Sequence, residues 1–247
     1  MRVFFGFDHL PHFEHPSATV GSYDGVHGGH ITLINRVVGA AKAQGGESIL
    51  LTFEPHPRVT LQCAEGLRLL TSTEEKARLL EGAGIDNMIV IPFDCAFSRL
   101  TPYEFLHDYL IEKVGVETLV VGYNHHFGHD KEGNFDYLNR LQEECNFHVL
   151  RVAEYDSESE KVSSTVIRRL IERGDMAHAA RMLTHPYLLV GELHEGVIHI
   201  SEPLKLLPPA GTYTVSINNT ATMLTITTEK VLKTNSKFST EKVIIIF

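Results

Sequence analysis

The chain has 247 residues, of which 43% are hydrophobic and 21% are charged, and its formal net charge is −9. This composition is that of a globular protein with a substantial core. The negative charge argues against general binding to nucleic acid, and no apolar run is long enough to span a membrane. Three scattered cysteines, Cys63, Cys95 and Cys145, fit free thiols in a reducing compartment, so we expect a cytoplasmic protein.

Up to about residue 153, short apolar runs alternate with helical periods. The expected strands are residues 17–20, 48–53, 87–92, 118–122 and 148–152. The expected helices between them are residues 29–44, 73–81, 102–113 and 134–145. Ser72 with Glu75, and Thr101 with Glu104, have the spacing of capping boxes at two helix starts. The alternation predicts an α/β fold with a parallel sheet, in which ligands bind beyond the carboxyl ends of the strands.

The pattern changes in the last third of the chain. A polar stretch at 156–161 precedes helical periods that begin near Ser163 and Met176. The short β-rich segments that follow are residues 187–193, 212–217, 223–227 and 243–247. They predict a small antiparallel sheet or partial barrel of roughly sixty residues, a size that needs support from a neighbour. We therefore expect two domains, residues 1–185 and 186–247.

The segment Gly21–His30 is the most informative motif. It follows an apolar strand and precedes a helical pattern, so it reads as a strand, a glycine-rich turn and a helix start. Free backbone N–H groups and the helix dipole at such a turn suit a phosphate, and His27 and His30 add donors to phosphoryl oxygens. Two alternatives remain open: Asp24, His27 and His30 as metal ligands, or ordinary surface histidines.

A second candidate anion site lies at the helix start formed by Ser163, Ser164 and Thr165. Arg168 follows about one turn later, on the same face. Hydroxyls, backbone N–H groups and a guanidinium at a helix start can bind phosphate. The simpler alternative is that the serines and the threonine only cap the helix.

Together these segments resemble the bacterial bifunctional riboflavin kinase/FAD synthetase family, and specifically its N-terminal FMN adenylyltransferase module. The matches run in order over roughly residues 15–190. The matching segments are residues 21–30, 52–57, 70–76, 92–94, 122–124, 127–128, 163–168 and 174–175. The resemblance implies a Rossmann-like nucleotidylyltransferase fold, followed by a small truncated antiparallel β-barrel-like domain. It also implies the reaction of ATP with FMN to give FAD and pyrophosphate, with Mg²⁺ carried on the ATP.

The resemblance also implies roles for individual residues. His30 would stabilise charge at the α-phosphoryl group, and His27 and Arg168 would lie toward the pyrophosphate. The expected ATP-binding residues are Gly21, Ser22, Tyr23, Asp24, His27, His30, Ser163, Ser164, Thr165 and Arg168. The expected flavin-binding residues are Phe53, Pro55, His56, Pro57, Tyr123, Asn124 and Phe127. Ordinary core packing is the alternative for the phenylalanines.

The chain departs from the family pattern in two places. His125 and His126 follow Asn124 where the family carries an aromatic residue, and with His129 they could instead bind a metal. In the C-terminal part, the family's Gly-Arg-x-x-Gly-Phe/Tyr-Pro-Thr-Ala-Asn segment is missing, and the chain passes through residues 200–204 to residues 206–213, which resemble a later piece of the kinase module. The resemblance therefore predicts FMN adenylyltransferase activity without riboflavin kinase activity. The alternatives are a paralogue with a different phosphate acceptor and a non-catalytic flavin- or nucleotide-binding regulator.

Overall fold

The computed structural model describes residues 1–124, 126–128, 132–153, 162–236, 238 and 240–247. The chain divides into two units, each assembled from separate stretches of sequence. Unit 1 comprises Met1–Tyr23, Gly29–Glu65 and Leu79–Tyr155. Unit 2 comprises Asp24–Gly28, Gly66–Arg78 and Asp156–Phe247. The helices α6 and α7, which precede residue 185, are thus grouped with the C-terminal strands.

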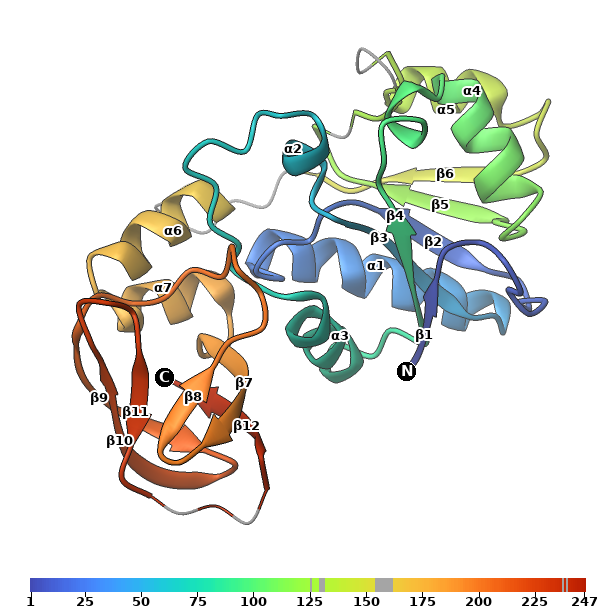
Figure 1. The fold of residues 1–247 in the computed structure, drawn as a ribbon. Helices are drawn as coiled ribbons and strands as arrows, with labels where there is room; N and C mark the ends of the chain where they lie inside the picture. Colours follow the sequence, from blue (N-terminus) through green and yellow to red (C-terminus); the bar gives the residue numbers. More distant parts are fainter. Residues whose placement is uncertain (125, 129–131, 154–161, 237, 239) are drawn as a thin grey trace. The chain divides into compact units, whose positions relative to one another are not determined.

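Unit 1 is built on a six-stranded parallel sheet with the order β1-β4-β3-β2-β5-β6 (Figure 1). The strands are β1 (Arg2–Phe5), β2 (Ser17–Val20), β3 (Ser48–Glu54), β4 (Asn87–Pro92), β5 (Thr118–Val121) and β6 (His148–Arg151). The helical elements are α1 (Gly28–Gln44), α2 (Pro57–Thr60), η1 (Phe97–Arg99), α4 (Pro102–Glu104), η2 (Phe105–Ile111) and α5 (Phe135–Leu141). A further helix, α3 (Thr73–Gly82), begins in unit 2 and ends in unit 1. All five predicted strands are present, and the sheet is parallel as expected.

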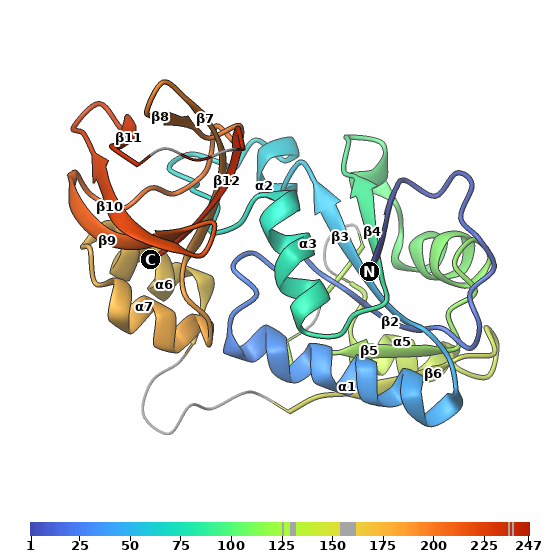
Figure 2. The same ribbon diagram turned by 90° about the horizontal axis from the view of Figure 1, so that it is seen from below.

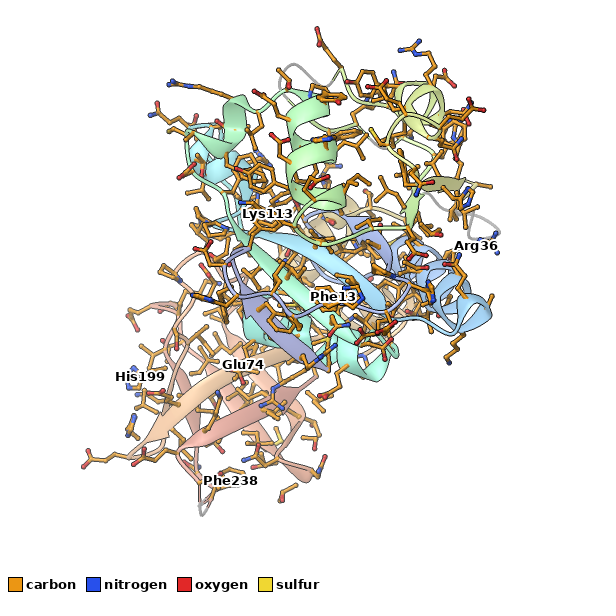
Figure 3. The ribbon with its side chains drawn as sticks, turned by 90° about the vertical axis from the view of Figure 1, so that its right-hand side faces the viewer. Phe13, Arg36, Glu74, Lys113, His199 and Phe238 are labelled. Carbon is orange, nitrogen blue, oxygen red and sulfur yellow. The ribbon has the colours of Figure 1, made fainter. Side chains whose placement is uncertain are left out.

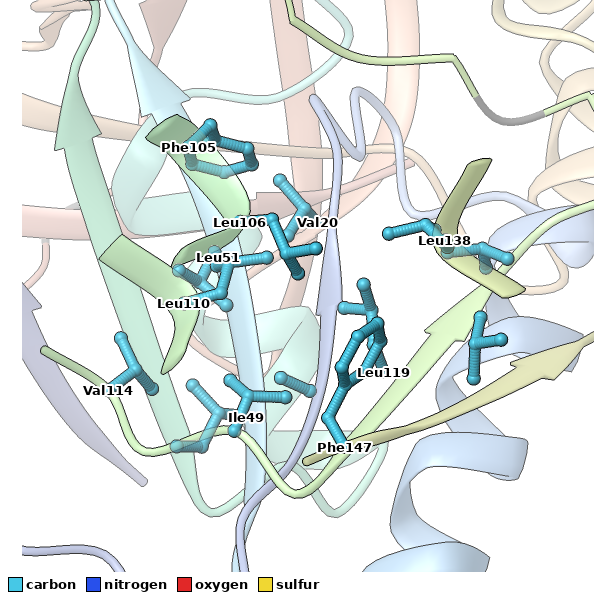
Figure 4. Close-up of a cluster of buried hydrophobic side chains, with 14 of the residues drawn as sticks. Val20, Ile49, Leu51, Phe105, Leu106, Leu110, Val114, Leu119, Leu138 and Phe147 are labelled. Carbon is cyan, nitrogen blue, oxygen red and sulfur yellow. The ribbon is translucent and has the colours of Figure 1, made fainter. Parts of the chain in front are cut away.

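The central strands of this sheet are buried on both faces, which explains their continuous apolar sequences. Ile49, Leu51 and Ile89 belong to one core cluster with Leu106 and Leu110 of η2 (Figure 4). The same cluster also contains Phe13, which Figure 3 labels, and Val20, Phe105, Val114, Leu119, Leu138 and Phe147. Alternate residues of a strand point to opposite faces, so the intervening residues, which are also buried, belong to the face toward α1 (Figure 2).

Unit 2 contains a closed antiparallel barrel with the order β10-β11-β8-β7-β12-β9. Its strands are β7 (Leu188–His194), β8 (Val197–His199), β9 (Gly211–Ile217), β10 (Thr220–Ile226), β11 (Leu232–Thr234) and β12 (Lys242–Ile246). The helices α6 (Ser164–Glu172) and α7 (Met176–Leu183) share one hydrophobic cluster with the barrel, through Ile167, Ile171 and Leu183. This shared core supplies the support that so small a barrel needs.

Several elements differ from the sequence-based expectation. β1, β8 and β11 were not predicted, since each has only three or four residues and β1 lies at the sheet edge with Phe5 71% exposed. The expected helix 102–113 is a short helix followed by a π-helical segment, and the helix expected at 134–145 ends at Leu141. The small antiparallel domain is present as expected, and it is a closed barrel, whereas the pattern of strands predicted a sheet or a partial barrel. Across the described residues, no helix combines the length and apolarity required to cross a bilayer.

Candidate functional site

The turn after β2 has an unusual backbone. Tyr23, Gly25 and Val26 all have positive φ, at 47°, 87° and 44°, respectively. Positive φ is uncommon outside glycine and is an outlier for a β-branched residue such as Val26, whose side chain is fully buried. Such strained backbone persists only where surrounding contacts hold it, and it often marks a functional turn. The contacts that hold this turn converge on Asp24.

Asp24 is buried, and its carboxylate is hydrogen-bonded and ion-paired to groups from two other segments of unit 2. Its Oδ1 accepts hydrogen bonds from the backbone N–H groups of Leu70 (2.8 Å) and Thr71 (3.0 Å). Its Oδ2 forms an ion pair of 2.5 Å with the Arg168 guanidinium. The Thr71 hydroxyl in turn accepts a hydrogen bond from the N–H of Gly25 at 3.0 Å. Asp24 therefore organises the turn, and its carboxylate is committed to protein groups in this structure.

The start of α6 is bound to the same turn. Ser164 Oγ donates a hydrogen bond of 3.0 Å to the carbonyl oxygen of Asp24, and Ser163 caps the helix by accepting from the N–H of Val166. The Arg168 guanidinium also donates to the carbonyl oxygen of Arg68 at 2.6 Å. The two predicted anion-binding segments, 140 residues apart, are thus brought together within unit 2. Thr165 is exposed at this helix start.

His27 follows the turn and is 8% exposed. Burial, opposed in part by a backbone hydrogen bond and by the charge of Asp24, lowers the pKa of His27 to about 4. The imidazole is therefore neutral at pH 7. A neutral imidazole placed beside Asp24 and Arg168 can accept a proton when negative charge is brought near it, because an anion stabilises the imidazolium form.

The shifted pKa of His27 predicts how stability depends on pH. The pKa of His27 is 6.5 in the unfolded chain and about 4 in the folded chain. At pH values between these two, His27 is protonated in the unfolded chain and neutral in the folded chain. Stability should therefore fall as the pH decreases through this window, by about 2 kcal/mol between pH 7 and pH 5. Denaturant titrations of wild type and His27→Gln at both pH values measure this contribution. His12→Gln, at an exposed position, should keep the wild-type slope, and an equal slope in His27→Gln would contradict the expectation.

Gly25 is required by both its backbone and its surroundings. A Cβ built at this position lies 2.7 Å from Leu70 Cδ1 and 3.3 Å from Leu183 Cδ2, and both leucines are fully buried. With the positive φ, Gly25→Ala should therefore cost about 1–3 kcal/mol of unfolding free energy. The matched control is Gly39→Ala within α1, where nothing lies within 4 Å of the new Cβ. This control should be neutral or stabilising by up to about 1 kcal/mol, and equal effects of the two substitutions would contradict the prediction.

The remaining predicted ATP-binding residues belong to unit 1. Gly21 continues the sheet by donating its N–H to the carbonyl oxygen of Leu51 at 3.0 Å, and the carbonyl oxygen of Ser22 accepts from the Thr52 hydroxyl at 3.2 Å. Tyr23 is buried, with its hydroxyl 2.6 Å from Thr19 Oγ1, and burial raises its pKa. His30 lies in the first turn of α1, with its ring centroid 5.0 Å from that of Tyr23. Tyr23 thus supports the His30 ring from within the core.

Unit 1 also contains an aromatic pocket of about 320 Å³ at the carboxyl ends of its strands. Its walls come from the ends of β2 and β3 and from the segments that follow β4 and β5, the region where ligands of parallel sheets bind. The lining residues are Val20, Gly21, Ser22, Phe53, Pro57, Leu61, Phe93, Phe97, Ser98, Leu100, Phe105, His126, Phe127 and Gly128. A pocket walled by five phenylalanines suits a flat aromatic ligand.

Three of the predicted flavin-binding residues, Phe53, Pro57 and Phe127, line this pocket. The others lie elsewhere. His56 caps α2 through a hydrogen bond from the N–H of Arg58, and Pro55 precedes it. Tyr123 is 51% exposed, with the Arg151 guanidinium 4.7 Å from its ring centroid, and Asn124 is exposed beside it.

Sequence reasoning missed three of the pocket's phenylalanines: Phe93, Phe97 and Phe105. Phe93 directly follows β4, so its position after a parallel strand was a usable signal. Phe97 and Phe105 reach the pocket from η1 and η2, which do not follow a strand directly. No local motif distinguishes these two residues from core phenylalanines.

The metal-site alternatives find no support in the described geometry. Among residues whose placement is described, no group of three His, Cys, Asp or Glu side chains is arranged to hold a metal ion. The carboxylate of Asp24 is bound by Arg168 and by backbone N–H groups. Of the three clustered histidines, His126 lines the aromatic pocket, whereas His125 and His129 lie outside the described residues.

Comparison with known proteins now places the chain in a family. A profile described as FAD synthetase matches residues 11–166. The FAD synthetase of Listeria monocytogenes is 32% identical over 196 residues, which are 79% of this chain and 78% of that protein. The bifunctional riboflavin kinase/FMN adenylyltransferase of the same organism is 35% identical over 178 residues, but the match covers only 56% of its length.

A solved structure shares the fold. The crystal structure titled macrolide-efflux protein from Streptococcus pneumoniae superposes with a TM-score of 0.83, covering 100% of this chain and 89% of that one, at 21% identity. At this identity the likeness concerns the fold alone. The family profile and the Listeria sequences carry the assignment: the chain belongs to the FAD synthetase family.

Proposed function

We propose that this protein is an FMN adenylyltransferase, which transfers AMP from ATP to FMN and yields FAD and pyrophosphate. The observation that carries the proposal is the hydrogen-bonded convergence of the Asp24 turn with the start of α6, which groups His27, Ser164 and Arg168 in unit 2. The aromatic pocket of unit 1 supports it independently, since it suits an isoalloxazine ring.

The reaction needs no covalent enzyme intermediate. An oxygen of the FMN phosphate attacks the α-phosphorus of ATP, the bond from that phosphorus to the bridging oxygen breaks, and pyrophosphate leaves with its Mg²⁺. The ion enters as part of the Mg·ATP substrate. The protein's task is then to position the two phosphates and to neutralise developing charge.

The residues of unit 2 suit the leaving pyrophosphate. Ser163, Ser164 and Thr165 place hydroxyls and backbone N–H groups at the positive end of the α6 dipole. His27 is neutral when no ligand is bound, and a bound triphosphate favours its protonated form, which adds positive charge where pyrophosphate accumulates. Arg168 adds a guanidinium whose orientation is fixed by Asp24 and by the carbonyl of Arg68. We assign His30, at the start of α1, to the α-phosphoryl group.

The aromatic pocket yields a test of flavin binding. Phe53→Ala removes a ring whose centroid lies 5.2 Å from that of Phe93 in the pocket wall. We expect KM for FMN to rise about tenfold or more, with KM for ATP changed little, because a buried aromatic contact contributes about 1.5–3 kcal/mol. Steady-state kinetics with each substrate varied in turn measures the split. Phe5→Ala, at an exposed position of β1, is the control, and equal changes in both KM values would contradict the assignment.

We further propose that the protein does not phosphorylate riboflavin. The family's kinase segment has no counterpart where residues 200–204 lead to residues 206–213, and the backbone of this stretch is hydrogen-bonded to Leu69. Lys205 within it is buried in an ion pair with Glu75, so this side chain is not available to a nucleotide.

The decisive experiment separates the two flavin reactions. The purified protein is incubated with Mg·ATP and either FMN or riboflavin, and the flavin products are identified by chromatography and mass spectrometry. FAD from FMN, with no FMN or FAD from riboflavin, is the expected result. Robust phosphorylation of riboflavin would overturn the second proposal, and absence of any turnover would favour a binding protein without catalytic activity.

One observation favours a second candidate acceptor. His126 lines the aromatic pocket and gives the flavin side a polar ring. A nucleotidyltransferase acting on a different phosphate acceptor fits this feature. Pyrophosphate release measured with ATP and a panel of phosphorylated acceptors distinguishes the candidates, since FMN should be preferred if the first proposal is correct.

A further inference from the structure

Lys205 lies in the connection between β8 and β9 and is 5% exposed. Its Nζ donates to the Glu75 carboxylate, to the carbonyl oxygen of Leu70 (2.5 Å) and to that of Leu188 (3.1 Å). The same Nζ lies 4.5 Å from the centroid of the Tyr187 ring. The charge is therefore fully accommodated by groups inside unit 2, as a buried lysine requires.

Glu75, its partner, is 0% exposed and serves three segments at once. Its Oε1 accepts from the N–H of Val190 in β7 at 2.8 Å. Its Oε2 accepts from the N–H of Ser72 at 2.8 Å, which completes the capping box at the start of α3. Together with Lys205, this carboxylate fixes the start of α3 to two parts of the barrel.

The segment between these groups and the nucleotide-binding turn is Arg68–Thr71. Leu69 pairs with the barrel connection: its N–H donates to the carbonyl of Leu204 at 2.7 Å, and its carbonyl accepts from the N–H of Leu206 at 2.8 Å. The next residue, Leu70, donates its N–H to Asp24 while its carbonyl accepts from Lys205. One residue thus joins the buried lysine to the buried aspartate.

The same short segment also orients Arg168. The carbonyl oxygen of Arg68 accepts from Arg168 Nε, and Asp24, which is held by Leu70 and Thr71, pairs with the other side of the guanidinium. Any displacement of this segment therefore moves both partners of Arg168 together. It also moves the turn that carries His27, because Gly25 donates to Thr71.

We propose that Lys205 and Glu75 are positioning residues for the triphosphate site. This inference rests on the function proposed above. Neither touches the nucleotide. They fix segment 68–75, which fixes Asp24, and Asp24 in turn sets the orientation of Arg168 and of the His27 turn. In this proposal the barrel remains part of the adenylyl-transfer apparatus after losing its kinase segment.

The test removes both charges at once, because removing Lys205 alone would leave Glu75 buried without a counter-ion. The double variant Lys205→Met/Glu75→Gln keeps similar volumes and an acceptor for one of the N–H groups. Glu75→Gln alone is measured in parallel. In this variant the Lys205 ammonium keeps the carbonyl oxygens of Leu70 and Leu188 as acceptors, so the test remains available if the double variant does not fold. The matched control is Lys230→Met, since Lys230 belongs to the same barrel but is exposed, with its Nζ donating to the carbonyl oxygen of Pro208.

Kinetics measured well below the melting temperature give the discriminating result. The double variant should raise KM for ATP or lower kcat by about tenfold or more, because displacements near 1 Å can cost as much as 10²-fold. KM for FMN should stay within about twofold in both variants and control, since no part of the aromatic pocket is altered. A lower melting temperature with unchanged KM for ATP and unchanged kcat would show a merely structural role and overturn the proposal.

A binding measurement keeps this inference separate from the proposed reaction. Titration with α,β-methylene ATP and Mg²⁺ reports triphosphate affinity without turnover. If wild type binds the analogue but forms no FAD, the proposed function fails, while weaker binding by the double variant than by Lys230→Met still supports the positioning role. Equal affinities of the double variant, Lys230→Met and wild type, together with unchanged kcat, would overturn it.

Discussion

Replacing His30 with alanine is expected to lower kcat for FAD formation by about 10²–10³-fold. His30 lies in the first turn of α1 and is supported by the buried ring of Tyr23. A donor held in place there costs no reorganisation when charge develops on the α-phosphoryl group, so its loss should appear in kcat more than in KM. Steady-state kinetics of the variant with saturating FMN and varied Mg·ATP measures the effect.

A matched histidine variant separates chemistry from general damage. His12→Ala changes an exposed imidazole and should leave kcat within about twofold, since surface substitutions have small effects. Both variants should melt at similar temperatures. If His30→Ala retained the wild-type kcat, His30 would have no part in the chemical step.

Replacing Asp24 with alanine should cause the largest loss of stability of any single change in the turn, about 3–5 kcal/mol. The carboxylate is buried, and its removal leaves the Arg168 guanidinium without its counter-ion and the N–H groups of Leu70 and Thr71 without their acceptor. Denaturant titration measures the cost. Activity should fall as well, because the His27 turn and Arg168 lose their common partner.

Asp24→Asn separates the stability lost with the hydrogen bonds of Asp24 from the stability lost with its charge. The amide oxygen can still accept from Leu70 and Thr71, so the remaining loss isolates the missing charge opposite Arg168. We expect an intermediate cost. Asp175→Ala, which removes an exposed helix cap of α7, should cost only about 1 kcal/mol, and a cost for Asp24→Ala as small as this would contradict the role of Asp24.

The parallel sheet could be predicted because its strands are short continuous apolar runs separated by helices with clear start signals. Ser72 with Glu75 and Thr101 with Glu104 do form the expected caps. β1 was missed although Val3, Phe4 and Phe5 are apolar, because so short a run with no helical period before it does not by itself indicate a strand. β8 and β11 were missed because each has only three residues. Such short strands form because they pair with neighbours in a closed barrel, which the local sequence does not indicate.

The parts of the candidate site that lie within one short segment could be predicted from the sequence of that segment. A strand, a glycine-rich turn and a helix start are visible in Gly21–His30, and the Ser-Ser-Thr helix start is visible in the same way. The role of Asp24 as the centre of a buried network was not, because its partners Leu70, Thr71 and Arg168 are 46 to 144 residues away and two of them contribute backbone groups. Backbone donors leave no signature in side-chain identity.

The discontinuous make-up of unit 2 has a consequence for how the protein matures. The five residues Asp24–Gly28 leave the ribosome early, yet the other residues of their unit lie at 66–78 and from 156 onward. Contacts between such distant stretches form slowly, since loop closure must precede them. The turn that contains Asp24 would therefore reach its strained conformation only after Arg168 has been synthesised, and a cut at residue 185 would separate Glu75 from its cation, Lys205.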